Sequence, residues 1–140
     1  MKKSIWLLIL SGLLGAALAG APPTITLLSP QNGATWRIGN SYPIAWSTVN
    51  GVSGRVFILL FKYNAANQLE FLGRIADVNY KRGSYLWKAG EHTGKMAGDD
   101  AMRMAGYGRY HIVVRLLCSQ YVENQDNNYF RLTPIFEPRL

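Results

Sequence analysis

Short β-branched and aromatic runs, each bounded by Gly, Asn, Asp or Pro, recur along most of this 140-residue chain. Beyond the first 19 residues, no segment repeats apolar residues at helical spacing, so the pattern is typical of an all-β protein. The expected strands are residues 24–29, 41–47, 55–63, 69–78, 83–88, 109–119 and 128–133, with a short extended piece at 35–37. Seven such strands predict an antiparallel β-sandwich.

The N-terminus has the layout of a secretory signal peptide. Lys2 and Lys3 precede an apolar run of 15 residues, 5–19, which ends in Ala17-Leu18-Ala19. This run is shorter than the roughly 20 residues that a membrane-spanning helix needs. We therefore expect cleavage after Ala19 and a secreted, periplasmic or surface-held protein. The alternative is an uncleaved segment, which would be the chain's one attachment to a membrane.

The remaining length predicts one domain, residues 20–133, followed by a short C-terminal tail at 134–140. Cys118 is the sole cysteine, so no intrachain disulfide can form, and strand alternation points its side chain inward. The net charge of +7 comes from scattered residues rather than a basic arm. This distribution argues against a nucleic-acid partner.

A resemblance extends over residues 24–133. Its motifs, in order, are ITLLSPQNGATW at 25–36, Gly39, YPIAW at 42–46, VFILL at 56–60, RIA at 74–76, GSYLW at 83–87, GRYHIVVR at 108–115 and YFRL at 129–132. This order resembles the Ig-like domain at the N-terminus of the yeast Kre/Knh cell-wall β-glucan assembly proteins and of fungal Ser/Thr-rich GPI-anchored proteins, which has similar copies in secreted prokaryotic proteins.

The resemblance implies an immunoglobulin-like or fibronectin-III-like sandwich, a role at the cell surface or cell wall, and no catalytic residues. The chain departs from the fungal pattern in having neither a Ser/Thr-rich stalk nor a GPI tail. That route of anchoring is therefore not carried over.

Alternate residues of a strand share a face, and the register of the family places one face of each middle strand inward. The expected core is Trp46, Val56, Ile58, Leu60, Trp87, Tyr110, Ile112, Val114, Leu116, Phe130 and Leu132. The opposite face carries Phe57, Leu59, Phe61, Val113 and Tyr129, interleaved with His111, Arg115 and Arg131.

An apolar outer face of this kind predicts an interaction site for an envelope protein or for a second copy of the chain. The alternative, weighed equally, is that the tail at 134–138 or the long connection at 89–108 folds over this face.

The connection at residues 89–108 shows no strand pattern and is long for a loop, which is typical of a functional or mobile segment. A helical turn around 99–104 is one expectation, because Asp99 is a suitable N-cap. His92, Met96, Met102 and Met104 also form a soft ligand set suited to copper. Otherwise these methionines plug the end of the sandwich.

Catalytic sets are missing from the sequence, so we expect a non-enzyme without cofactors. The two histidines, His92 and His111, stand apart from Cys118, and the eight acids are spread over turns. The expected function is protein binding, adhesion or assembly in the cell envelope. Polysaccharide binding is the second hypothesis and copper binding a distant third. Candidate tyrosines for stacking on sugars are Tyr63, Tyr80, Tyr107, Tyr121 and Tyr129.

Overall fold

A computed structural model describes the protein over residues 23–49, 54–117 and 122–134. The predicted signal peptide, Cys118, Tyr121 and residues 135–140 of the tail lie outside these ranges. The elements are β1 (Thr24–Ser29), β2 (Ala34–Arg37), β3 (Ser41–Val49), β4 (Arg55–Tyr63), β5 (Leu69–Asn79), the 3-10 turn η1 (Tyr80–Arg82), β6 (Ser84–Lys88), β7 (Glu91–His92), β8 (Arg103–Met104), β9 (Gly108–Leu116), β10 (Val122–Glu123) and β11 (Phe130–Thr133). No helix within the described ranges is long and apolar enough to cross a membrane.

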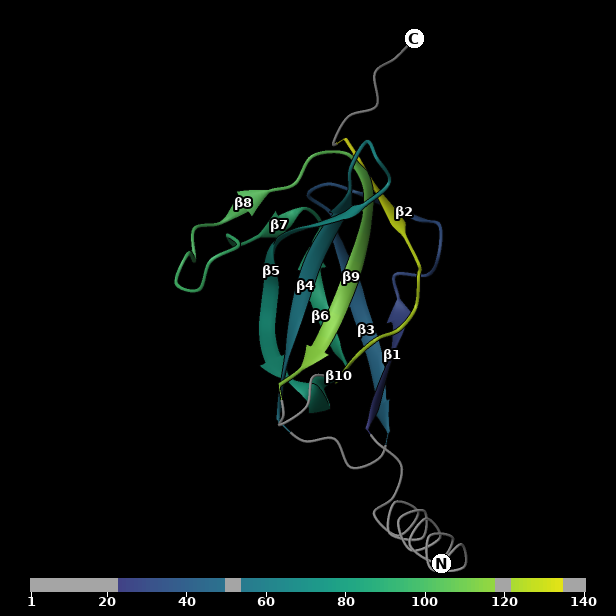
Figure 1. The fold of residues 1–140 in the computed structure, drawn as a ribbon, viewed down its shortest axis with the longest axis vertical. Coiled ribbons are helices and arrows are strands. Elements are labelled where there is room, and N and C mark those ends of the chain that lie inside the picture. Colours follow the sequence, from purple (N-terminus) through teal and green to yellow (C-terminus); the bar gives the residue numbers. More distant parts are fainter. Residues whose placement is uncertain (1–22, 50–53, 118–121, 135–140) are drawn as a thin grey trace, which may run out of the picture.

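Two sheets form a β-sandwich, as the strand pattern predicts (Figure 1). The smaller sheet has the order β1-β3-β6, and the larger has the order β2-β11-β9-β4-β5, with β10 added beside β9. In Figure 1 the strands β4, β5 and β9 lie side by side in one layer, with β3 and β6 behind them. The expectation of a wholly antiparallel fold is wrong at one pair, because β2 runs parallel to β11.

The core lies between the two sheets and includes all of the expected residues, together with others such as Ile25, Ile44 and Val78. Trp46 and Trp87 of the smaller sheet are 3% and 1% exposed, and Ile58 and Leu60 of the larger sheet are fully buried. Trp36 joins this core from β2 and stacks on Tyr42 with a centroid distance of 4.8 Å. Each of these large aromatic side chains removes on the order of 200 Å² from water, which makes them the main source of core stability.

The last strand begins two residues later than the sequence pattern predicts. Asn128 and Tyr129 were expected in it, but β11 starts at Phe130. Their backbone groups have other partners: Nδ1 of His111 lies 2.7 Å from the Asn128 carbonyl oxygen, the Tyr129 amide donates to Oδ1 of Asn32, and the Tyr129 carbonyl oxygen accepts from the Gly33 amide. These bonds take the place of the backbone hydrogen bonds that a strand starting at residue 128 would make with its neighbours.

The connection at 89–108 contains a strand pair that the sequence analysis missed. β7 and β8 form a two-stranded hairpin, which projects beside β5 in Figure 1. The expected helical turn at 99–104 is wrong, because Arg103 pairs with His92 in this hairpin. The Asp99 carboxylate does not cap a helix and instead bonds the Arg103 guanidinium at 2.7 Å.

Candidate functional site

The outer face of the larger sheet carries the apolar side chains that alternation places there. Phe57, Leu59 and Phe61 of β4 are absent from the core between the sheets, whereas their neighbours Val56, Ile58 and Leu60 belong to it. On β9 the cross-strand partners of these three residues are Arg115, Val113 and His111. The two strands are therefore neighbours, and their outward-facing residues share one face of the sheet.

Strand β5 completes the face with residues that the sequence analysis did not single out. Phe71 pairs with Phe61 in the ladder, and the two rings lie 5.3 Å apart. Arg74 pairs with Leu59, and its guanidinium lies 5.3 Å from the centroid of the Phe57 ring. This side of the sheet is therefore an aromatic surface with one cation held over it.

The loop at 93–100, which joins β7 to β8, is anchored on β5 at a glycine. The Thr93 amide and hydroxyl donate to the Arg74 carbonyl oxygen at 2.8 and 3.1 Å. A Cβ at Gly73 would lie 1.8 Å from the Thr93 carbonyl oxygen. Since real Cβ atoms do not approach so closely, the loop can dock here because residue 73 has no side chain.

A pocket of about 290 Å³ lies between this loop and the sheet. Its floor is made by Phe57, Leu59, Phe61 and Phe71. The charged residues on its lining are Arg74, Lys95, Asp99, Asp100 and Arg115. The pocket therefore combines an apolar floor with a rim that carries charges of both signs.

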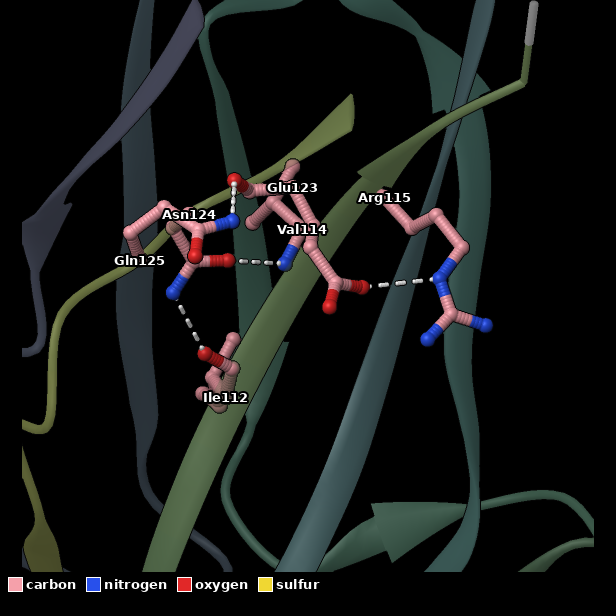
Figure 2. Close-up of polar contacts among 6 residues, drawn as sticks. All are labelled: Ile112, Val114, Arg115, Glu123, Asn124 and Gln125. Atoms are coloured by element: carbon pink, nitrogen blue, oxygen red, sulfur yellow. Dashed lines mark hydrogen bonds and ion pairs between the residues drawn. The ribbon is translucent and has the colours of Figure 1, made fainter. Parts of the chain in front are cut away.

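Arg115, which lines the pocket, is bonded to the segment at 123–125, and Figure 2 shows this bond. Its Nε donates to Oε2 of Glu123 at 2.9 Å. The next residue, Asn124, is buried, and its side-chain amide accepts from the Val114 N–H and donates to the Ile112 carbonyl (Figure 2). The amide of this side chain thus stands in for a peptide group and continues the ladder where β10 ends.

The eight predicted face residues divide into three groups. Phe57, Leu59, Phe61 and Arg115 line the pocket. His111 and Val113 lie on the same face but are buried, at 6% and 8% exposure, outside the pocket lining. Tyr129 and Arg131 belong to a separate cluster, in which both Arg109 and Arg131 lie near the Tyr129 ring.

The long connection partly covers the apolar face, as the alternative hypothesis expected. Its loop at 93–100 supplies one wall of the pocket and leaves the pocket between itself and the sheet. The tail beyond Pro134, the other expected cover, lies outside the described residues. The long connection is therefore part of the candidate site.

Of the set proposed for copper, the structure separates His92 from Met104. His92 is buried, and its Nδ1 lies 2.7 Å from the Thr93 carbonyl oxygen, while Met96, Met102 and Met104 are 77%, 61% and 51% exposed. In the hairpin Met104 pairs with Glu91, next to the pair of His92 with Arg103, so Met104 and His92 face opposite sides. Across the described ranges, no group of three or more His, Cys, Asp or Glu side chains could hold a metal.

Two of the candidate tyrosines, Tyr63 and Tyr129, come together around the Arg109 guanidinium. Tyr107 is 72% exposed, and Tyr80 is half-buried beside the core.

No protein-family model matches the chain, and no curated protein matches it either.

Proposed function

We propose that this protein is a non-catalytic binding module, and that it holds a partner protein through the pocket between the sheet and the 93–100 loop. The observation that carries the proposal is the aromatic floor of this pocket, formed by Phe57, Phe61 and Phe71 around Leu59. Apolar surface of this kind, framed by charged groups, is what an aromatic or long aliphatic side chain of a partner would bury.

The size of the pocket favours a side chain of a partner over a small-molecule substrate. Pockets for drug-sized ligands have volumes of about 300–1,000 Å³. The volume here, about 290 Å³, is just below that range and suits one or two side chains. The charges on the rim have both signs, with Arg74 beside Asp100 at 3.4 Å. Such a rim would orient a peptide chain rather than bind one ion.

The non-catalytic part of the proposal is supported by the state of the histidines. Both His92 and His111 are buried, and the Nδ1 atom of each lies 2.7 Å from a backbone carbonyl oxygen. Neither residue lines the pocket. A general base must be within hydrogen-bond reach of the proton that it abstracts from a bound substrate.

The place of action that we propose is the cell envelope or the extracellular space. It rests on the signal-peptide layout of residues 1–19 and on the resemblance of residues 24–133 to an Ig-like cell-wall module. The sandwich of two sheets is the architecture that such a module has. We propose the Ig-like type on these grounds.

A different protein is a better partner than a second copy of the chain. The chain carries a net charge of +7, or +5 once Lys2 and Lys3 leave with the predicted signal peptide (13 minus 8), so two copies repel each other at low ionic strength. A partner of lower or negative charge meets no such barrier.

The test is a selection of random peptides displayed on phage against the purified chain, followed by titration of the best peptide. The wild type is compared with Phe61→Ser in the pocket and with Leu86→Ser, whose side chain is 66% exposed on the smaller sheet. Enriched peptides should carry one aromatic or long aliphatic anchor. Phe61→Ser should lower the affinity for the peptide by about tenfold or more, because loss of a central contact costs about 2 kcal/mol of binding free energy.

Leu86→Ser should bind the peptide like the wild type. Equal loss in both variants, or enriched peptides without any apolar anchor, would contradict the proposal. The thermal unfolding midpoint of each variant shows that the comparison is between folded proteins.

A further inference from the structure

A second cluster on the outer face combines two arginines with two tyrosines, and we name Tyr63, Arg109, Tyr129 and Arg131 the arginine–tyrosine cluster. Arg109 on β9 and Arg131 on β11 are direct cross-strand partners. The Arg109 guanidinium lies 4.9 Å from the Tyr63 centroid and 5.7 Å from that of Tyr129, and the Arg131 guanidinium lies 5.8 Å from the same Tyr129 ring. Three strands and a loop thus gather two positive charges at one place.

Among the residues that the structure describes, no carboxylate neutralises either charge of the cluster. Like charges placed directly opposite each other on neighbouring strands destabilise a sheet. Within the described residues, neither Arg109 nor Arg131 forms an ion pair, and Arg109 donates to the side-chain oxygen of Asn67. Four other arginines do pair with a carboxylate: Arg55, Arg74, Arg103 and Arg115.

The tyrosines position the two guanidinium groups without cancelling their charge. An aromatic face attracts a cation through its quadrupole and restricts its motion, yet it leaves the N–H edge of the guanidinium able to donate. That edge forms paired hydrogen bonds with a carboxylate or a phosphate. The cluster is therefore preorganised for an anion from outside the chain.

A shallow hollow of about 240 Å³ beside the cluster adds an exposed aromatic ring. Its lining includes Arg109, Arg131 and Tyr107. Tyr107 is 72% exposed, and no ring contact or hydrogen bond of its side chain is found among the described residues. An exposed tyrosine offers a flat apolar face with a polar tip, which matches the face of a sugar ring and its hydroxyl groups.

We propose that this hollow and the arginine–tyrosine cluster bind an acidic polysaccharide, with a uronate residue as the recognised unit. The sugar ring lies against Tyr107, and its carboxylate accepts from Arg109 and Arg131. The combination of a stacking face with paired cations favours this ligand over a polyanion without rings. The site is separate from the pocket, so it gives the protein a second ligand beyond the partner protein.

The experiment measures binding of an oligogalacturonate to the purified full chain by titration calorimetry at low salt. The ligand control is the same oligosaccharide with its carboxylates methyl-esterified. The protein variants are Arg109→Gln/Arg131→Gln and Tyr107→Ala. The matched control is Arg82→Gln, which removes an arginine that lies over another tyrosine, Tyr85, at 6.0 Å.

The double variant should weaken binding by about tenfold or more, as expected for the loss of charge-assisted hydrogen bonds. Tyr107→Ala should weaken it as well, whereas Arg82→Gln and Phe61→Ser should not. Raising the salt concentration should weaken binding to the wild type, because the contacts are exposed and electrostatic.

Equal binding of the methyl ester, or an unchanged affinity of the double variant, would overturn the proposal. So would an equal loss in Arg82→Gln, since that would trace binding to net charge alone. If polyphosphate or vesicles of anionic lipid bind as tightly and Tyr107→Ala is without effect, the assignment to a sugar is wrong. Binding of the oligogalacturonate and of its methyl ester to the wild type tests the need for the carboxylate even where a variant fails to fold.

Discussion

Asn124 shows how one buried side chain can replace a piece of backbone. Its amide bonds both the Val114 N–H and the Ile112 carbonyl on β9 (Figure 2). Asn124→Ala should lower the free energy of unfolding by about 2–4 kcal/mol, because two buried backbone groups lose their partners. Chemical denaturation measures this change.

Gln125→Ala is the matched control for that experiment. Gln125 is exposed, and its amide donates to the Glu123 carbonyl. Its removal should change the free energy of unfolding by no more than about 0.5 kcal/mol. An Asn124→Ala variant as stable as Gln125→Ala would show that the ladder does not depend on this side chain.

Tyr110 couples the stability of the fold to alkaline pH. Burial raises the pKa of Tyr110 from 10.0 to about 12, and its hydroxyl donates to the Gly106 carbonyl at 2.6 Å. Below pH 10 the folded and unfolded states both keep this proton, so the contribution to stability is fully present. Between pH 10 and about 12 the unfolded state releases the proton first, so the free energy of unfolding falls, by at most about 1.4 kcal/mol per pH unit.

Tyr110→Phe should remove this part of the pH dependence, while Tyr107→Phe should retain it. The measurement is the denaturant midpoint of each variant between pH 9 and about 12.5, a range set by the two pKa values. The same slope in Tyr110→Phe and in the wild type would assign the loss of alkaline stability to other groups.

At the scale of residues, the sequence predicts most of the apolar floor of the site and, of its charged residues, Arg115 alone. Phe57, Leu59 and Phe61 follow a strict alternation along β4, so their shared face can be deduced from spacing. Arg74 cannot be found in this way. Its partner across the ladder, Leu59, is fixed only by the irregular register of β5.

At the scale of elements, the pairing of β5 with β4 is irregular at two places. Two register shifts, between Ile58 and Leu59 and between Leu60 and Phe61, add a residue to β5 each time. The residues facing the outer side of β5 are therefore Phe71, Arg74 and Asp77, which are three apart rather than two. Bulges of this kind depend on tertiary packing, so the alternation of apolar and polar residues along the sequence does not predict them.

The β7–β8 hairpin was missed for a related reason. Each of its strands has two residues, too few to show any alternation. The hairpin exists because its neighbours hold it, with the Thr93 amide bonded to the Arg74 carbonyl and the Ala105 amide to the Gly90 carbonyl. The hairpin therefore depends on contacts between segments that are distant in sequence, and the local sequence pattern does not reveal them.

Gly73→Ala tests the docking of the 93–100 loop. The new methyl group would overlap the Thr93 carbonyl oxygen, so the loop must leave β5. We expect a loss of about 1–3 kcal/mol in the free energy of unfolding, as for an overpacked site. Trypsin should also cleave faster after Lys95 and Arg103, and the pocket should lose its affinity for the anchor peptide.

Gly106→Ala is the control for this effect, because a Cβ at that position meets nothing within 4 Å. It should leave both the trypsin cleavage rate and peptide binding unchanged. If Gly73→Ala behaves in the same way, the contact between the loop and β5 does not hold the pocket together.

For the whole molecule, we expect a monomer in solution. The net charge of +7 opposes association of copies, so light scattering should give a molar mass near that of one 15.6 kDa chain, less any leader that is removed. A dimer that dissociates in Phe57→Ser and Phe61→Ser, but not in Leu86→Ser, would show that the pocket binds a second copy instead of a different protein.

We propose that the pocket on the larger sheet contacts a protein partner in the cell envelope or outside the cell. Photo-crosslinking from single positions tests it most directly, with benzoylphenylalanine placed at Phe61 in the pocket or at Leu86 on the exposed side of β6. We expect one discrete adduct from position 61, which disappears when Phe71→Ser is added, and none from position 86. The same adduct from both positions, or none from position 61, would contradict it.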